Sequence, residues 1–216
     1  NADDPIQKEK LATYINKFGF SQTDHNYYHI TFDGADPFVK LSFEDVAITT
    51  NLIGAYNFAN CAIATLIGKY FNIPKSDIKA ALETYLPDNN RSQIIAKNGH
   101  HIVLDAYNAN PTSMQGALES FSKTENGNNF LFLGDMFELG ETAHDEHQKI
   151  ADLTQKLGFQ NVSFVGEHFS KVQTEMKKFE TFQKLKEYLA KNPLPPSSML
   201  IKGSRGMALE RILDCI

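Results

Sequence analysis

A short stretch of this chain, residues 105–114, carries side chains suited to binding a polar ligand. Its candidates are a carboxylate, a phenol and two amides: Asp105, Tyr107, Asn108 and Asn110. The apolar run 102–104 predicts a buried strand, and Pro111 favours the first position of a helix. In open α/β sheets, ligands bind in loops that join strand ends to helices. Asp105 can accept hydrogen bonds from a ribose diol, and the two amides can form hydrogen bonds with a nucleotide base or a peptide backbone. The alternative is a turn without a ligand, because these residue types form turns.

The segment 202–206 joins another apolar run to a helical pattern and carries the cations Lys202 and Arg205. Gly203 can leave backbone N–H groups free, and the N-terminus of a helix attracts negative charge. These features predict an anion-binding site. The alternative is a helix cap formed by Ser204.

The glycine-flanked loop 134–140 carries two acids, Asp135 and Glu138. As a pair they can orient an ammonium group or a cation bound to phosphate, and turn formation is the alternative. His144 and His147 follow, three residues apart, a spacing that raises the question of a metal site. Thr142 and Asp145 match a capping box, however, which predicts that both histidines lie in the first turn of a helix. No further ligands occur at definite spacing, so we expect no metal site.

The elements that must position these residues fall into two patterned regions. From residue 92 onward, strands alternate with helices, which predicts an α/β fold with a Rossmann-like, mostly parallel sheet. We expect buried strands at 102–104, 130–133, 162–165 and 199–201, helices at 112–122, 143–157, 182–191 and 207–213, and an edge strand at 92–97. Their polar loops should gather along one edge of the sheet.

The N-terminal region has an α+β pattern. Pro5 opens a helix that Gly19 can end, alternating apolar residues from 27 to 50 predict a small antiparallel meander, and helices follow at 54–71 and 75–85. In the 54–71 helix, Asn57 and Asn60 should share a face opposite the apolar stripe, where they are either ligand contacts or solvated amides. The polar, proline-containing segment 86–90 predicts a boundary. We therefore expect domains at 1–91 and 92–216, with Arg91 at the hinge.

Composition limits the class of protein. The chain has 216 residues and a net charge of −5, which argues against nucleic acid as a main partner. No apolar stretch approaches the roughly 20 residues that cross a membrane, so we expect no membrane insertion. Cys61 and Cys215 form no disulfide pattern, which favours a reducing, cytoplasmic location. We also expect a monomer.

Four sequence blocks together resemble the Mur ligase family. They are Asp-Ala-Tyr-Asn-Ala-Asn-Pro-Thr-Ser-Met at 105–114, Gly-Ala-Tyr-Asn-Phe-Ala-Asn at 54–60, Leu-Gly-Asp-Met-Phe-Glu-Leu-Gly at 133–140 and Lys-Gly-Ser-Arg at 202–205. Each block alone is weak evidence, but four in the family's order are specific. They are most similar to the members that add D-alanyl-D-alanine to UDP-N-acetylmuramoyl-tripeptide.

The resemblance implies roles for individual residues. It implies ATP contacts from the end of a central domain and from the last domain: Asn57, Asn60, Arg91, Asp105, Tyr107, Asn108 and Asn110. It implies dipeptide contacts from the last domain: Lys202, Gly203, Ser204, Arg205, Asp135 and His147. Tyr56 stands where many members have a histidine, so a role for that imidazole is not transferred.

The resemblance also implies what this chain lacks. The intact enzyme would use ATP and Mg²⁺ to activate the tripeptide carboxylate as an acyl phosphate, but no Gly-x-x-x-x-Gly-Lys-Ser/Thr phosphate loop occurs here. We therefore expect a C-terminal part of a ligase, inactive by itself, with the Mg²⁺ ligands elsewhere. The alternatives are a non-catalytic nucleotide-binding module and another Mur or folate-type ligase.

Overall fold

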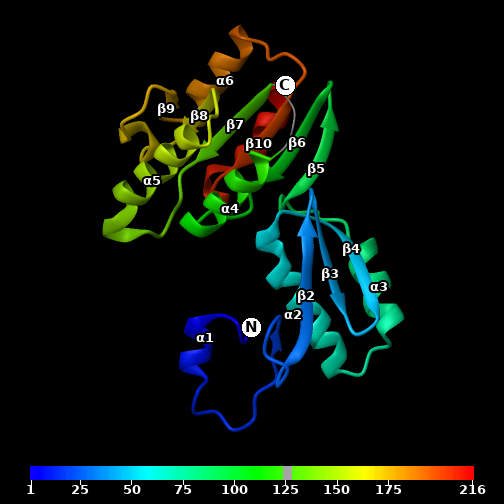
Figure 1. Ribbon diagram of the computed structural model, residues 1–216. Coiled ribbons are helices and arrows are strands. Elements are labelled where there is room, and N and C mark those ends of the chain that lie inside the picture. Colours follow the sequence, from blue (N-terminus) through cyan, green and yellow to red (C-terminus); the bar gives the residue numbers. More distant parts are fainter. Residues whose placement is uncertain (124–127) are drawn as a thin grey trace. The chain divides into compact units, whose positions relative to one another are not determined.

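The structure is a computed structural model that describes residues 1–123 and 128–216. The chain divides into two compact units, Asn1–Leu86 and Pro87–Ile216 (Figure 1). The sequence places the boundary a few residues later, at 91/92, and assigns the preceding part to a central domain. Hinge behaviour of this segment and that domain assignment stay predictions.

The N-terminal unit is built on a four-stranded sheet with the order β1-β2-β3-β4. Its strands are β1 (Phe20–Ser21), β2 (Tyr28–Ala35), β3 (Phe38–Phe43) and β4 (Val46–Ile53). β2, β3 and β4 form the antiparallel meander that the alternating pattern predicts, and β1 adds a parallel edge. One face is apolar because Val39, Leu41 and Phe43 alternate along β3 and are buried.

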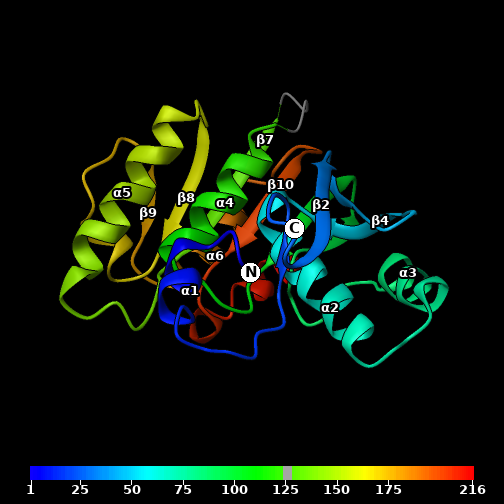
Figure 2. The same cartoon turned by 60° about the horizontal axis from the view of Figure 1, so that its bottom comes forward.

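Three helices accompany this sheet: α1 (Pro5–Lys10), α2 (Phe58–Tyr70) and α3 (Lys75–Thr84). Asp4 caps α1, since its carboxylate accepts the Gln7 N–H at 3.0 Å. The helix ends at Lys10, however, so the prediction that it continues to Gly19 is wrong; none of its residues is buried, and packing does not extend it. α2 and α3 contact each other beside the sheet (Figure 2).

The buried face of α2 differs from the predicted apolar stripe, which consists of Ala55, Phe58, Ala59, Ala62, Ile63, Leu66 and Tyr70. Phe58, Ala62 and Leu66 are buried as expected, but Ile63 and Tyr70 are exposed by 43% and 62%. The helix begins at Phe58 after a 3₁₀ turn (Ala55–Asn57). Within the helix the buried side chains are those of Phe58, Cys61, Ala62, Thr65 and Leu66. The buried face therefore includes the Cys61 and Thr65 side, and Ile63 and Tyr70 fall outside it.

The C-terminal unit contains a six-stranded sheet with the order β5-β6-β10-β7-β8-β9. Its strands are β5 (Gln93–Lys97), β6 (His100–Asp105), β7 (Asn129–Gly134), β8 (Asn161–Val165), β9 (Lys177–Phe179) and β10 (Ser198–Lys202). All neighbouring pairs are parallel except β5 with β6. The predicted mostly parallel sheet with an antiparallel edge is confirmed, and β9 is an additional edge strand.

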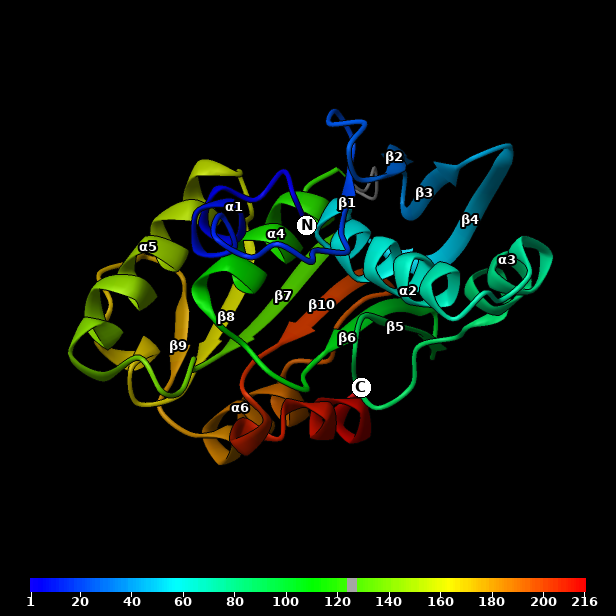
Figure 3. The ribbon, with the colours of Figure 1, turned by 90° about the horizontal axis from the view of Figure 1, so that it is seen from below.

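Helices cover both faces of this sheet. α4 (Pro111–Phe121) and α5 (Ala143–Lys156) share one core with the sheet, and α6 (Phe182–Lys191) and the C-terminal segment share the other (Figure 3). The strands are consequently apolar on both sides, as parallel strands between helices usually are. β10 is buried along its whole length, from Ser198 to Lys202.

Two local predictions in this unit are wrong. The segment expected as a helix at 207–213 forms two 3₁₀ turns, Arg205–Met207 and Leu209–Cys215, separated by Ala208 in the left-handed conformation. A left-handed residue interrupts the α-helical hydrogen-bond pattern. The Thr142–Asp145 capping box is also absent, because the Thr142 hydroxyl donates to the Leu139 carbonyl instead. His144 and His147 do lie at the start of α5.

Candidate functional site

The polar loops gather at the carboxyl ends of three adjacent strands, β6, β10 and β7. Asp105 is the last residue of β6 and Lys202 the last of β10, and the parallel register pairs them directly. On its other side, β10 pairs in parallel with β7, which ends at Gly134. A Cβ on Gly203 would stand 3.1 Å from the Gly134 Cα, so the chains that leave β10 and β7 run in close contact. This edge is where a parallel sheet binds ligands.

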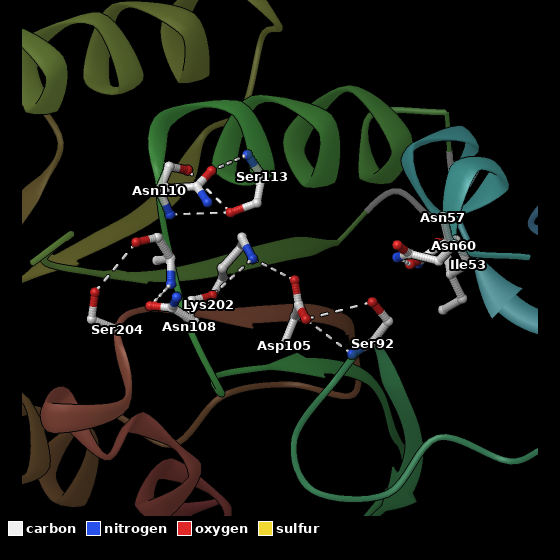
Figure 4. A network of polar contacts seen from close by, with 11 residues as sticks. Ile53, Asn57, Asn60, Ser92, Asp105, Asn108, Asn110, Ser113, Lys202 and Ser204 are labelled. Atoms are coloured by element: carbon white, nitrogen blue, oxygen red, sulfur yellow. Dashed lines mark hydrogen bonds and ion pairs between the residues drawn. The ribbon is translucent and has the colours of Figure 1, made fainter. Parts of the chain in front are cut away.

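Asp105 and Lys202 form a buried ion pair (Figure 4). The Lys202 ammonium donates to the Asp105 Oδ2 atom, and Lys202 is only 1% exposed. The other carboxylate oxygen accepts the Ser92 N–H at 3.0 Å, with the Ser92 hydroxyl at 3.5 Å. The carboxylate is therefore held from both sides.

Asn108 and Asn110 shape the loop that follows Asp105. The Asn108 side-chain oxygen accepts the N–H of Ala109 at 2.9 Å. Asn110 caps α4: its side-chain oxygen accepts the Ser113 N–H at 2.9 Å, and its own N–H donates to the Ser113 hydroxyl at 3.1 Å. Both oxygens already serve the loop, and both residues remain exposed. Their predicted contacts with ATP stay predictions.

Tyr107 lies close to two guanidinium groups. The Arg91 Cζ atom is 3.7 Å from the Tyr107 ring centroid, and the Arg205 Cζ atom is 5.0 Å from it. A hydrogen bond from Arg91, together with the charges of both arginines, lowers the pKa of the Tyr107 phenol below its ordinary value. Both arginines are exposed. Guanidinium groups arranged in this way suit phosphate or carboxylate oxygens.

Ser204 links three strand-end loops through its side chain and its backbone. Its hydroxyl accepts the Phe137 N–H at 2.9 Å and lies 3.5 Å from the Ala109 carbonyl. Its own N–H donates to the Asp135 carbonyl at 3.1 Å. Ser204 does not cap a helix with its side chain, because only a 3₁₀ turn follows it. The prediction of a helix N-terminus at this segment is therefore wrong.

Asp135 is a buried anchor for a neighbouring loop. Its carboxylate accepts the N–H groups of His168 and Phe169, both at 2.9 Å, and its residue is 2% exposed. Gly166 makes room for it: Gly166 has a φ of +129°, and a Cβ there would overlap the carboxylate. Glu138, in contrast, is exposed. The predicted contact of Asp135 with the dipeptide stays a prediction.

His147 supports the same loop from α5. Its Nε2 atom accepts the Met136 N–H at 3.0 Å, so the proton must be on Nδ1, which donates to the Ala143 carbonyl at 2.6 Å. Burial lowers the pKa of His147 below its ordinary value, which agrees with a neutral ring. The Asp135 Oδ1 atom, 3.6 Å from Nε2, is therefore not a salt-bridge partner. Both nitrogens are used within the protein, and His147 is fully buried.

In the N-terminal unit, Asn57 and Asn60 are joined to each other (Figure 4). The Asn60 amide donates to the Asn57 Oδ1 atom at 3.0 Å, and the Asn57 amide donates to the Ile53 carbonyl at 2.8 Å. Asn57 is 7% exposed, whereas Asn60 is exposed. The prediction that both amides face away from the buried side is therefore wrong for Asn57, which lies in the 3₁₀ turn.

Sequence reasoning missed two residues of this arrangement, Ser92 and Gly166. Ser92 starts the edge region, and no motif marks it as a partner of Asp105. Gly166 follows β8, where a glycine after an apolar strand was a visible signal. Its partner Asp135 is far away in sequence, so the need for a missing side chain appears only in three dimensions.

Neither a metal cluster nor a membrane-spanning helix is found in the described part of the chain. Residues 1–123 and 128–216 contain no group of three or more histidine, cysteine or acidic side chains that could hold a metal ion. Within the same residues, no helix is both long and apolar enough to cross a membrane.

The fold and the strand-end loops define a ligand-binding α/β unit of the kind found in nucleotide-dependent enzymes. The family described as "Mur ligase, glutamate ligase domain" matches residues 90–205. This match covers more than half of the 216 residues. The chain belongs to the Mur ligase family.

Individual relatives narrow the similarity. The UDP-N-acetylmuramoyl-tripeptide–D-alanyl-D-alanine ligase of Bacillus subtilis is 33% identical over 181 residues, covering 75% of this chain and 38% of that protein. The ligase of the same name from Borreliella burgdorferi is 30% identical over 172 residues, covering 76% and 37%. This chain therefore spans less than two-fifths of the length of these relatives.

Solved structures agree on the fold. The MurF ligase of Thermotoga maritima in complex with ADP superposes with a TM-score of 0.81 at 19% identity, covering 99% of this chain and 51% of that one. MurF of Acinetobacter baumannii superposes with a TM-score of 0.69 at 26% identity, covering 82% and 41%.

Gly166→Ala should destabilise the C-terminal unit strongly. Alanine is strained at a φ of +129°, and its methyl group would displace the Asp135 carboxylate from its N–H donors. We expect a loss of about 2–5 kcal/mol in the free energy of unfolding, measured by urea titration. Gly158→Ala is the matched control: its φ is +79° and nothing lies within 4 Å of the added Cβ. Equal losses in both variants would contradict the close fit between Gly166 and Asp135.

Stability should fall as the pH falls below about 6.5, in part because of His147. Its folded pKa lies below the ordinary value of 6.5, so the unfolded chain binds a proton in this window that the folded chain does not. The contribution is complete above pH 6.5 and is lost on acidification, at up to about 1.4 kcal/mol per pH unit for one proton. Buried His100, whose pKa is also lowered by burial, adds to the slope.

The slope can be assigned by urea titrations at several pH values. His147→Asn should lower stability at neutral pH but flatten the acid slope. His101→Asn is the matched comparison, because it removes an exposed histidine of β6 that is not among the groups acting on His147. An unchanged slope in His147→Asn would show that His147 titrates normally in the folded protein.

Proposed function

We propose that this chain is the C-terminal part of an ATP-dependent ligase that adds D-alanyl-D-alanine to UDP-N-acetylmuramoyl-tripeptide in peptidoglycan synthesis. Membership in the Mur ligase family supports the reaction class. The names of the relatives from Bacillus subtilis and Borreliella burgdorferi support the dipeptide as the incoming substrate.

One structural observation carries this proposal. Within three residues of chain, the carboxyl end of β6 presents the held carboxylate of Asp105 and the phenol of Tyr107, with Arg91 and Arg205 close to the phenol ring. A fixed carboxylate suits the ribose diol of ATP, and guanidinium groups suit phosphate and carboxylate. The edge therefore offers complementary groups for a nucleotide and for an anionic acceptor side by side.

The residues of this chain would act by position and charge. In the proposed reaction, the tripeptide carboxylate attacks the γ-phosphate of ATP, which breaks the bond to the β-phosphate, releases ADP and gives an acyl phosphate. The amine of the dipeptide then attacks the carbonyl carbon, and the tetrahedral intermediate collapses to an amide and phosphate. Arg91 would contact nucleotide phosphates and Arg205 the dipeptide carboxylate, which aligns the reactants without a covalent intermediate on the protein. The nucleotide contact predicted for Asn60 stays part of the proposal.

Mg²⁺ belongs to the proposed reaction as the partner of ATP phosphates. The described residues offer no cluster of acids or histidines that suits it. We therefore assign no step to a metal ligand of this chain. A cytoplasmic location and a monomeric state remain part of the proposal.

The function is tested by turnover of the intact protein encoded by the full-length gene. With ATP, Mg²⁺, UDP-N-acetylmuramoyl-tripeptide and D-alanyl-D-alanine, we expect phosphate release that requires both the tripeptide and the dipeptide. ATP binding without ligation would favour a non-catalytic nucleotide-binding module. Ligation of another amino acid or of glutamate in place of the dipeptide would favour a different Mur or folate-type ligase.

Arg205→Ala in the intact protein should raise the KM of D-alanyl-D-alanine before that of ATP. A desolvated guanidinium–carboxylate contact is worth about 2–4 kcal/mol, and less when water reaches it. Arg211→Ala is a matched control, because Arg211 stacks on Phe182 at 4.0 Å, away from Tyr107. Steady-state kinetics with each substrate varied in turn decides the assignment. An increase confined to the ATP KM would assign Arg205 to the nucleotide together with Arg91.

A further inference from the structure

The sequence groups Lys202 with Arg205 as a contact for the dipeptide, but the structure separates the two side chains. Arg205 is exposed, whereas Lys202 is 1% exposed and its ammonium points at Asp105. Figure 4 shows this ammonium between the Asp105 carboxylate and the Asn108 backbone. An ammonium buried in this way cannot reach a ligand carboxylate without leaving Asp105 unpaired, which is costly for a buried charge.

The contacts around Asp105 are divided between its two oxygens. Oδ2 accepts the Lys202 ammonium, and Oδ1 accepts the Ser92 N–H. The Ser92 hydroxyl also lies 3.5 Å from Oδ1. A carboxylate has about four acceptor positions, so a position remains on Oδ2 for a ribose hydroxyl. Lys202 also lies 3.5 Å from the Asn108 carbonyl, so the same ammonium approaches the loop that carries Tyr107 and Asn108.

The charge of Lys202 matters as much as its geometry. An unpaired carboxylate beside a nucleotide would repel the triphosphate, because charges interact strongly where water is excluded. The Lys202 ammonium neutralises Asp105 while it leaves the carboxylate as an acceptor of hydrogen bonds. Ribose recognition and phosphate binding then become compatible at one edge of the sheet.

We propose that Lys202 is a positioning residue of the nucleotide site, which holds and neutralises the Asp105 carboxylate for the ribose diol of ATP, and that it is not a dipeptide contact. This inference rests on the proposed ATP-dependent function. Lys202 therefore has a different role from Arg205, its near neighbour in sequence, because its ammonium contacts Asp105.

The test uses the intact full-length protein and compares Lys202→Met with the wild type. Affinities for non-hydrolysable analogues of ATP and of 2′,3′-dideoxy-ATP are measured by calorimetry. The wild type should prefer the ribose form, and Lys202→Met should lose affinity for that form by about ten- to a hundredfold. The ratio between the two ligands should fall toward one, an effect that a general loss of stability would not produce.

Kinetics provides the second readout. The dipeptide KM of Lys202→Met should stay within about twofold of the wild type. Lys202→Arg keeps a cation next to Asp105 and should recover part of the ribose preference. Lys178→Met is the matched control, a lysine in β9 of the same sheet whose ammonium donates to the Val172 carbonyl, and it should behave as the wild type.

A folding defect is handled by a double variant. Lys202→Met leaves a buried carboxylate without its cation, whereas Asp105→Asn combined with Lys202→Met leaves no buried charge at this position. The double variant should regain stability and still lack the ribose preference. An unchanged ribose preference in a folded variant without the Lys202 cation, or a rise in dipeptide KM alone, overturns the inference. Failure of the wild type to bind either ATP analogue would instead contradict the proposed function.

Discussion

The ion pair between Asp105 and Lys202 is the constraint on which the rest of the candidate site depends. Two opposite charges at the ends of adjacent strands are nearly removed from water, so each is tolerable only while the other is present. The parallel register that pairs these two residues is therefore tied to the chemistry of the edge. If this register slipped by one residue, the side chain of Asp105 or Lys202 would move to the opposite face of the sheet, where it would lie unpaired in an apolar core. The pair is best understood as a device that specifies one arrangement, since buried ion pairs add little net stability.

Around this pair, the strand-end loops are fastened to one another mainly through backbone groups. Asp135 receives two N–H groups from the loop after β8, and its carbonyl receives the Ser204 N–H. His147 accepts the next N–H along the chain, that of Met136. Asp135 and His147, whose side chains could be reactive, thus hold the strand-end loops in place. Their burial and saturated hydrogen bonds make the loops rigid, and a rigid support is what precise placement of exposed groups requires.

Apart from the Asp105 carboxylate, the groups left to meet a ligand are the exposed ones. Arg91 and Arg205 both contact the Tyr107 ring, and this contact limits the movement of two long, flexible side chains. Such ordering reduces the entropy that binding must overcome. Buried charged and polar residues thus determine where the loops lie. Guanidinium groups at the surface supply the positive charge that binds a phosphate or carboxylate.

Sequence alone determined the class of fold and the neighbourhood of the site. Apolar runs followed by polar loops predict parallel strands, and the blocks at 105–114 and 202–205 mark the sheet edge at which these loops meet, because hydrophobic periodicity and turn chemistry are local properties. The short α1, the rotated face of α2 and the 3₁₀ turns after Arg205 were missed, because packing and a left-handed Ala208 decide them. Only the tertiary structure showed that Lys202 faces Asp105, that Ser92 completes the pair and that Gly166 makes room for Asp135. Those relations join residues distant in sequence, and strand order and register, which no local pattern encodes, bring them together.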